Sequence, residues 1–399
     1  MAVSTRLAVL GLVLLVTACA EPVAEQPPPV PVARQVPADV AALISAADAF
    51  GLDLLTAPAL ADHPNLVVSP MSVSLALQMI GAGAAGETAA QITKVLHLPD
   101  GVRPRLPAFD QTDLKVSNTA WTQRGLELKP DYRDTLRTLF GTTLREADFL
   151  ADPDGARSRI NQAVADQTAG KITDLFPPES IDQDTRLVLT NALYLKASWA
   201  QEFPIDKTTD APFTRGDGST VTVPMMHNDP YQEPTVDLGY AEGPDYQVVT
   251  LPYRGGKLAF TVIVPAAIDA VRGKGIAAIL SEVRPAPVAL AMPRFTARSA
   301  MNLTETLKAA GMPAAFSPAA DFSGITDDAD LHIDTVQHKT FVQVDEKGTE
   351  AAAATGVDAQ PVSAPSMHTV TVDRPFLFVI TDTATGAPLF LGKITDPTA

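Results

Sequence analysis

A run of small residues at 345–362, DEKGTEAAAATGVDAQPV, most constrains how this chain can fold. Successive side chains of a strand point to opposite faces, so the run separates into two sets. One set is small, apolar or β-branched: Thr349, Ala351, Ala353, Thr355, Val357 and Ala359. The other set carries the charges: Glu350, Ala352, Ala354, Gly356, Asp358 and Gln360. The pattern predicts a strand with one face that can be buried and one that is wetted.

The same run is poorly suited to a permanent place in a core. Alanine has low strand propensity, and Gly348 and Gly356 lower it further. Small side chains instead suit a segment that slides between existing strands without overpacking them. We therefore expect a strand that is not yet part of a sheet.

Length and charge limit the classes of protein. A chain of 399 residues that is 46% hydrophobic can bury a large core. No second linker and no internal repeat follows Ala38, so we expect one domain over residues 38–399. The net charge of −16 and the scattered lysines and arginines argue against nucleic acid as a partner.

The N-terminus has the pattern of an export signal. Arg6 precedes an apolar run from Leu7 to Val16, which is too short to span a membrane stably. Val16-Thr17-Ala18-Cys19 resembles the bacterial lipobox, in which the cysteine is lipidated. Cleavage after Ala20 is the alternative. We favour lipidation because Cys19 is the only cysteine, which also leaves no disulfide possible.

We therefore predict a signal peptide over residues 1–18 and a proline-rich tether over 19–37 that holds the domain off the membrane. The expected location is the bacterial cell envelope, as a lipoprotein, or the extracellular space. Contact with a membrane would occur only through the lipid anchor.

Helical and strand-like patterns are both present beyond the tether. The helical patterns cover residues 38–57, 70–80, 87–96, 130–140, 156–169 and 302–312, with Ser69 as the N-cap of the second. Strand-like runs include TRLVLTNALYLKASW, YQVVTLPY, KLAFTVIVP and PVALAMPRF, and a C-terminal hairpin is expected around Thr385-Gly386. Because helices come first and strands crowd the second half, the order predicts an α+β fold.

The patterns that would suggest an enzyme or a cofactor site do not hold up. Gly81, Gly83 and Gly86 form G-x-G-x-x-G, but a helix precedes them where a dinucleotide site needs a strand, so we expect a turn between two helices. The six histidines lack metal-ligand spacing, and no G-x-S-x-G elbow or Cys/His pairing occurs. We predict no catalytic residue, no metal and no cofactor.

From about residue 38 onward the chain resembles the serpin family, in that family's order of motifs. The matching segments include NLVVSPMSVSLAL, GETAAQITKVL, LVLTNALYLKASWAQEF, LPYRGGKLAFTVIVP, DLHIDTVQHKTFVQVDEKGTEAAAATG and DRPFLFVITDTATGAPLFLGKI. The resemblance implies a large central, mostly antiparallel sheet that accepts an inserted strand, two smaller sheets and about eight to nine helices.

The resemblance also implies suicide inhibition of a protease. The target cleaves a reactive loop, here about residues 346–374, and forms an acyl-enzyme. The loop then inserts as a new central strand and carries the protease to the far pole. A strand of ~15 residues spans ~50 Å, which is enough for that displacement.

Residues of the loop take their expected roles from the same resemblance. Glu346 opens the loop, so the cut is expected between Val362 and Ser363, although Ser363 or Ala364 as the residue before the cut stays open. The hinge is Glu346, Gly348, Thr349, Ala351 and Ala353, and the bait before the cut is Ala359, Gln360 and Pro361. Valine after proline favours an elastase-like serine protease, with a subtilisin-like one as the alternative.

Two further groups carry over by position. The family's shutter, a buried polar network that parts during insertion, matches Ser69, Ser72, Asn191 and His338. The breach, where insertion begins, matches Trp199, Arg294 and Glu346, and we expect an ion pair between the last two.

Two departures from the family pattern affect the expectations. Residues 97–113 are short and proline-broken where the family has a full helix, and they offer only Arg103 and Arg105 as neighbouring bases, so no heparin-type cofactor is expected. Ala163 replaces a tryptophan found in many members, which alters local packing.

The prediction is a monomeric, irreversible inhibitor that forms a covalent acyl complex with a serine protease. The alternatives are a non-inhibitory binding member of the fold, a cross-class inhibitor of cysteine proteases, and an envelope hydrolase, which the missing nucleophile disfavours.

Overall fold

Eight α-helices occur in the part of the chain that the computed structural model describes, which is residues 37–61, 63–99, 114–141, 144–230, 237–266, 268–327, 331–349 and 367–399. They are α1 (Ala38–Leu55), α2 (Pro70–Gly81), α3 (Gly86–Val95), α4 (Pro130–Phe140), α5 (Pro153–Gln167), α6 (Ile268–Lys274), α7 (Ile276–Glu282) and α8 (Thr304–Ala310). Short 3₁₀ turns are η1 (Pro58–Leu60), η2 (Ile205–Lys207) and η3 (Ala314–Phe316).

The helix ends follow from residue chemistry. Proline is the first residue of α2, α4 and α5, where its missing N–H is not needed. Gly141 and Gly311 follow α4 and α8 with φ of 61° and 116°, in the left-handed region that glycine enters without strain. Ser69 holds the predicted N-cap position of α2, although its hydroxyl makes no capping hydrogen bond.

The central sheet has the strand order β3-β2-β4-β14-β15-β5, with β13 also paired to β14. Its strands are β2 (Leu114–Gln123), β3 (Arg145–Ala147), β4 (Leu187–Leu195), β5 (Ala197–Ser198), β13 (Phe295–Asn302), β14 (Thr335–Asp345) and β15 (Gly348–Thr349). β4 runs antiparallel to β2 and parallel to β14. The central sheet therefore contains one long parallel pair next to antiparallel ones.

Two further sheets complete the fold. A seven-stranded sheet has the order β1-β18-β17-β10-β9-β8-β11, and a four-stranded sheet has the order β16-β12-β7-β6. The strands of the first are β1 (Asn65–Val68), β8 (Leu238–Glu242), β9 (Gln247–Pro252), β10 (Leu258–Val264), β11 (Arg284–Ala286), β17 (Phe376–Asp382) and β18 (Pro388–Ile394). Those of the second are β6 (Thr209–Thr214), β7 (Thr220–His227), β12 (Val288–Pro293) and β16 (His368–Thr371). The α+β class is confirmed, as is the C-terminal hairpin, which β17 and β18 form.

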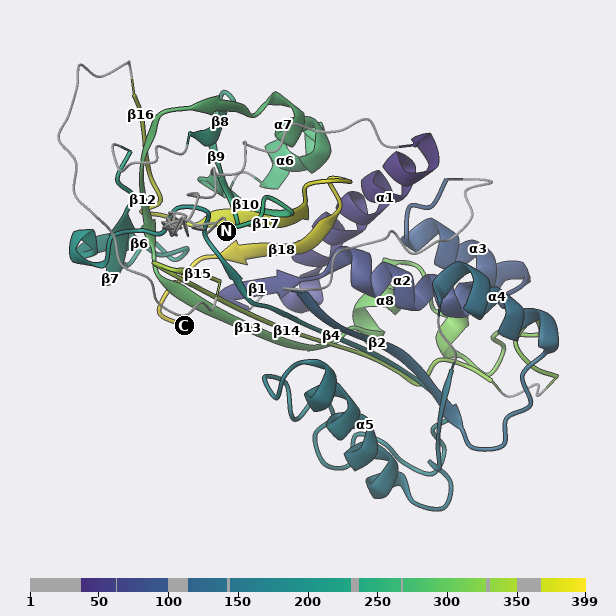
Figure 1. Ribbon diagram of the computed structural model, residues 1–399. Helices are drawn as coiled ribbons and strands as arrows, with labels where there is room; N and C mark the ends of the chain where they lie inside the picture. Colours follow the sequence, from purple (N-terminus) through teal and green to yellow (C-terminus); the bar gives the residue numbers. More distant parts are fainter. Residues whose placement is uncertain are drawn as a thin grey trace, which may run out of the picture.

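The central sheet is covered on both faces. Figure 1 shows α2, α3, α4 and α8 on one side of the long strands and α5 on the other. Val73, Leu77 and Ile80 of α2 are fully buried in the larger core cluster, whereas Ile160 and Val164 of α5 are buried in a separate, smaller cluster. Any strand added to this sheet would therefore lie between two packed layers.

The glycine motif forms a turn between helices, as predicted. α2 ends at Gly81 and α3 begins at Gly86. A Cβ on Gly83 would come within 2.3 Å of Ile325 Cγ1, so close packing explains the glycine there. With a helix before the glycines, the turn lacks the strand that a dinucleotide site requires.

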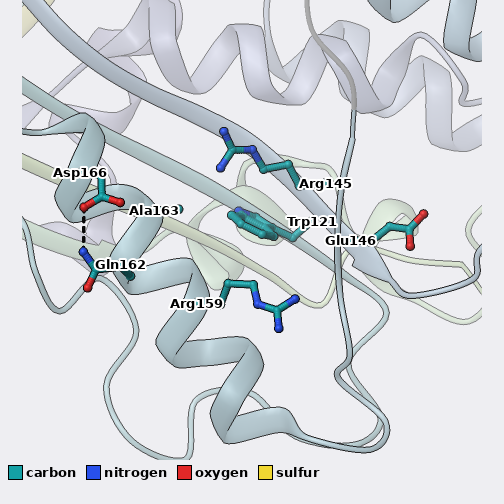
Figure 2. A pocket seen from close by; sticks show the side chains of 7 residues that line it. All are labelled: Trp121, Arg145, Glu146, Arg159, Gln162, Ala163 and Asp166. Atoms are coloured by element: carbon teal, nitrogen blue, oxygen red, sulfur yellow. Dashed lines mark hydrogen bonds between the residues drawn. The ribbon is translucent and has the colours of Figure 1, made fainter.

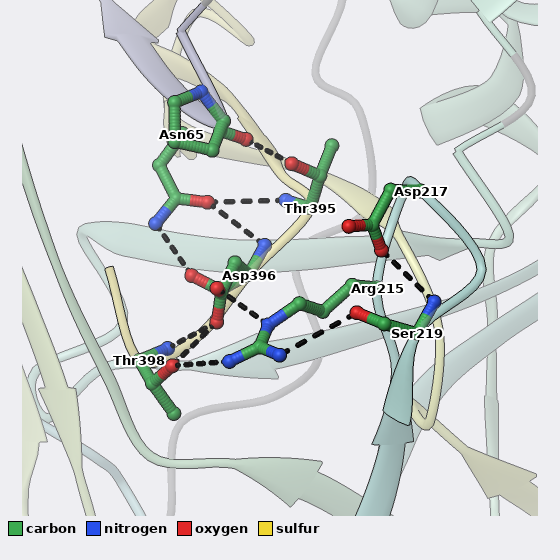
Figure 3. Close-up of polar contacts among 8 residues, drawn as sticks. Asn65, Arg215, Asp217, Ser219, Thr395, Asp396 and Thr398 are labelled. Atoms are coloured by element: carbon green, nitrogen blue, oxygen red, sulfur yellow. Dashed lines mark hydrogen bonds and ion pairs between the residues drawn. The ribbon is translucent and has the colours of Figure 1, made fainter. Parts of the chain in front are cut away.

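Polar side chains hold the C-terminal segment against β1 (Figure 3). Asn65 donates from Nδ2 to the carbonyl oxygen of Asp396, 2.6 Å away, and accepts from the amide nitrogens of Thr395 and Asp396. Arg215, at the end of the β6–β7 hairpin, donates to Asp396 Oδ2 over 2.6 Å. The network joins the seven-stranded and four-stranded sheets.

No helix among the described residues is long and apolar enough to cross a membrane. Cys19 and the rest of residues 1–36 lie outside the described part, as do residues 100–113, where the truncated helix was expected.

Candidate functional site

Two residues, Gly348 and Thr349, occupy the opening between β14 and β5. They form β15, in which Thr349 pairs with Val344 on one side and Ala197 on the other, and Gly348 pairs with Asp345 and Ser198. Both pairings are antiparallel. The start of the small-residue run is therefore already seated in the central sheet, as a strand of two residues.

The seat of β15 is closely fitted. The Thr349 side chain is fully buried, and its hydroxyl lies 2.6 Å from that of Tyr253. Gly348 has a φ of 145°, and a Cβ there would stand 2.2 Å from the carbonyl oxygen of Ala197. Only glycine fits at 348. Burial raises the pKa of the Tyr253 hydroxyl, more than its hydrogen bond with Thr349 lowers it, so both groups stay neutral.

Beyond β15, β14 pairs directly with β4. Their parallel register runs from Thr335 opposite Val188 to Phe341 opposite Tyr194. The rings of Phe341 and Tyr194 lie 6.2 Å apart at the last pair, and Lys171 Nζ lies 5.7–5.8 Å from the centre of each ring. Arg298 also stands 4.9 Å over Phe341. Sequence reasoning missed this cluster, because cation–π contacts leave no local sequence signal.

Trp199, which the family resemblance assigns to the breach, packs beside the turn between β14 and β15. Its indole stacks on Tyr253, with ring centres 4.7 Å apart and planes 10° from parallel. Its Nε1 donates to the carbonyl oxygen of Asp345 over 2.9 Å, and its backbone nitrogen donates to that of Lys347. Trp199 thereby fixes the turn between β14 and β15.

The expected ion pair is present, since Arg294 donates to Glu346 Oε1. The same oxygen accepts a hydrogen bond from Thr208 Oγ1 at 2.7 Å, and the Glu346 side chain is only 6% exposed. Burial alone would raise the pKa of Glu346, but the bonds from Arg294 and Thr208 outweigh it and hold that pKa below its usual value. Glu346 is therefore a buried anion whose carboxylate is paired with Arg294 and hydrogen-bonded to Thr208.

The residues assigned to the shutter lie on β4, on β14 and at the start of α2, and they form two hydrogen-bonded groups. Asn191 Nδ2 donates to Ser72 Oγ at 2.6 Å and to Asn118 Oδ1 at 2.7 Å. Separately, the backbone nitrogen of Ser69 donates to His338 Nε2 at 3.0 Å. Asn118, on β2, is an acceptor that sequence reasoning did not name, because nothing local marks which residue of β2 faces α2.

The two shutter groups meet across the parallel pair, because His338 and Asn191 are register partners. Three of their buried polar atoms have no hydrogen-bond partner among the described residues: Ser69 Oγ, Asn191 Oδ1 and His338 Nδ1. Burial lowers the pKa of His338 to about 3, although the backbone of Asn191 acts in the opposite direction. The imidazole is therefore neutral at physiological pH. The network could form further hydrogen bonds through the three atoms that lack partners.

Several predicted residues lie outside the described part of the chain. They are the hinge positions Ala351 and Ala353 and the bait and cut positions Ala359, Gln360, Pro361, Val362 and Ser363. Within the described ranges, no group of three or more His, Cys, Asp or Glu side chains could hold a metal ion.

Comparison with known proteins decides the family. The family model for serpins, described as serine protease inhibitors, matches residues 45–397. The chain belongs to the serpin family. It is 35% identical over 376 residues to a serpin-like protein of Thermococcus kodakarensis, covering 89% of this chain and 86% of the relative. It is 33% identical to the leukocyte elastase inhibitor of Homo sapiens, covering 89% and 99%.

Solved structures agree on the fold of this serpin. The native state of the thermophilic serpin tengpin superposes with a TM-score of 0.78 at 27% identity, over 92% of this chain and 97% of tengpin. Native protease nexin-1 with heparin gives a TM-score of 0.75 at 26% identity, over 90% and 100%. Family and relatives together support protease inhibition as the general activity.

Proposed function

We propose that this serpin is an irreversible suicide inhibitor of serine proteases, acting by cleavage of its reactive loop and insertion of that loop between β4 and β14. The single observation that carries the proposal is the position of β15, which lies between β14 and β5 and is antiparallel to both. Since β4 and β14 are parallel to each other, a strand continuing from β15 would be antiparallel to each. One weaker parallel pair would become two antiparallel pairs.

The register of β15 can be extended along the sequence. If it continues unchanged, Ala351 pairs with Leu195 and Val342, and Ala353 pairs with Leu193 and Thr340. Side chains paired in register share a face of the sheet. All four of these sheet residues are buried. The sheet residues that would pair with Thr355 and Val357 are buried as well. The small, uncharged set of the run therefore coincides with the core face.

Position 355 falls at the shutter in this extended register. Thr355 would pair with Asn191 on β4 and with His338 on β14, and these two residues are now each other's partners. Asn191 Oδ1 and His338 Nδ1 lack partners among the described residues. A threonine hydroxyl is both donor and acceptor, so it is chemically suited to either group.

The proposed target class is elastase-like. The bait Ala359-Gln360-Pro361-Val362 presents a small β-branched residue before the cut, which suits a shallow apolar pocket. The leukocyte elastase inhibitors of Mus musculus and Homo sapiens, at 34% and 33% identity, support this class. A monomer anchored by lipidated Cys19 in the cell envelope, with no heparin-type cofactor, remains part of the proposal.

The deciding experiment mixes the purified protein with elastase-like, trypsin-like and subtilisin-like serine proteases and with a papain-like cysteine protease. We expect an SDS-resistant adduct with the elastase-like enzyme. We also expect a released C-terminal fragment whose mass shows that it begins at Ser363. The cut protein should also melt well above the intact one. Cleavage with neither an adduct nor a rise in melting temperature would point to a non-inhibitory member.

A matched pair of variants tests the inserted register. Ala353→Glu places a carboxylate against buried Leu193 and Thr340, so adduct formation should fall at least ~100-fold in favour of simple cleavage. Ala354→Glu, one residue on, would point to the α5 face beside Lys339, a partly exposed cation, and should retain more inhibition than Ala353→Glu. Equal behaviour of the two would contradict the register.

A further inference from the structure

A surface pocket of about 520 Å³ lies between α5 and the edge of the central sheet formed by β2 and β3. Its lining comes from one residue of β2, two of β3 and four of α5: Trp121, Arg145, Glu146, Arg159, Gln162, Ala163 and Asp166 (Figure 2). The loop-insertion site lies elsewhere, between β4 and β14, so the pocket has no part in the proposed function. Its volume falls in the range of small-molecule sites.

The pocket exists because of a small residue on α5. Arg159, Gln162, Ala163 and Asp166 are spaced so that they share one face of the helix. Ala163 is the position where many serpins carry tryptophan, and here it is only partly buried. The alanine leaves open the space between the helix and the indole of Trp121.

Some hydrogen-bond donors of the lining have no acceptor among the described residues. Among the described residues, Arg145 and Arg159 form no ion pair, and Arg145 stands 5.4 Å over the ring of Trp121. The charge of Arg159 acts on Asp148, but that carboxylate is already paired with Arg124 at 3.0 Å. Trp121 is 3% exposed, and its indole N–H has no acceptor within the described part of the chain. A buried donor of this kind calls for a partner.

The two acidic residues of the lining do not supply that acceptor. Asp166 accepts from Gln162 Nε2 at 2.7 Å. Glu146 is exposed, and Figure 2 shows its carboxylate directed away from the indole. Figure 2 also shows the two guanidinium groups on either side of the Trp121 ring. The pocket therefore combines two cations and one indole donor with an apolar wall.

We propose that this pocket binds a small monocarboxylate with an aromatic or aliphatic body. The carboxylate would accept hydrogen bonds from the guanidinium group of Arg145, which suits a planar anion, and the positive charge of Arg159 on the other side of the indole would add attraction. The apolar body would fill the space over Ala163 and the indole. The carboxylate oxygens of the ligand could also accept a hydrogen bond from the Trp121 N–H, which has no acceptor among the described residues.

The chain offers a direct optical test, because Trp121 and Trp199 are its only tryptophans. In the full-length Trp199→Phe variant, Trp121 is the sole emitter. We expect 4-phenylbutyrate to change its emission in a saturable way, with a Kd at least ~10-fold below that of the neutral 4-phenyl-1-butanol. Titration calorimetry on the unsubstituted protein gives the same comparison if the variant does not fold.

Variants separate this site from unspecific binding. Arg145→Gln should weaken 4-phenylbutyrate binding at least ~10-fold, Arg159→Gln should weaken it by a smaller factor, and Ala163→Phe should fill the pocket and abolish binding. Arg137→Gln removes an exposed arginine of α4 and should leave the Kd unchanged. Equal affinity for the acid and the alcohol, undiminished binding in both arginine variants, or no binding at millimolar probe would overturn the proposal.

Discussion

Thr349 and Tyr253 join two buried hydroxyls at 2.6 Å, although 96 residues separate them in sequence. The bond ties the first residues of the small-residue run to β9 and its following turn. A side chain at 349 must therefore be small and capable of sharing a hydrogen bond. This requirement leads to the first prediction.

Thr349→Arg should convert the inhibitor into a substrate. The guanidinium would have to enter a fully buried position beside Tyr253 without an anion, which is strongly unfavourable. The loop should still be cut, but SDS-resistant complex should fall at least ~100-fold, measured on gels against an elastase-like protease. Thr349→Ser keeps the hydroxyl and should inhibit nearly as well; a stable complex in the arginine variant would refute the reasoning.

Glu346→Lys should destabilise the breach. It replaces a buried anion by a cation facing Arg294, and breaking a buried pair costs ~3–5 kcal/mol. We expect the lower end of that range because Arg294 is 43% exposed. On mild heating, native gels should show a ladder of polymers. Glu305→Lys reverses a 79% exposed charge of α8 and should show none.

Asp48 should make the protein less stable as pH rises. Burial raises the pKa of Asp48 to about 7 in the folded protein, although the N–H of Ala277 acts in the opposite direction. The folded state thus holds a proton that the unfolded state has lost above pH ~4. The free energy of unfolding should fall by up to ~4 kcal/mol between pH 4 and 7 from this group. Asp48→Asn should remove this contribution, measured by urea unfolding as the change in pH slope relative to the unsubstituted protein, whereas Asp53→Asn, at an exposed ion pair, should leave the slope unchanged.

His338 should have the opposite effect. Its pKa is about 3 when folded and near 6.5 when unfolded, so its contribution to stability is complete above pH ~6.5 and is lost as pH falls toward 3. His338→Gln should cost ~1–2 kcal/mol at pH 7 and remove that acid-side loss. Because Asp48 and His338 oppose each other, each single variant should reveal the other's slope. Unchanged pH profiles in both variants would contradict the assignment; His63→Gln, at an exposed site, is the control.

The helices and strands could be predicted largely from local patterns. Pro70, Pro130 and Gly311 mark helix ends through chemistry that needs no tertiary context. Ser69 holds the predicted N-cap position, but its hydroxyl makes no capping bond, and its backbone N–H donates to His338, 269 residues away. Such a contact depends on the packing of α2 against the sheet and has no local signature.

The site divides in the same way. The alternation from Thr349 onward could be read directly, and so could the charge match between Arg294 and Glu346 once the family resemblance had placed them. The Tyr253 hydroxyl, the Thr208 bond to Glu346 and the cations over Phe341 could not. Each arises where strands distant in sequence meet, so only the fold brings the partners together.

The pairing of β1 with β18 has a consequence for how the chain matures. Asn65 and Asp396 are 331 residues apart, yet among the described strands β1 pairs only with β18. During synthesis on the ribosome, the apolar residues 66–68 cannot pair with β18 until almost the whole polypeptide has emerged. During that delay the segment is exposed to chaperones and to aggregation with other nascent chains.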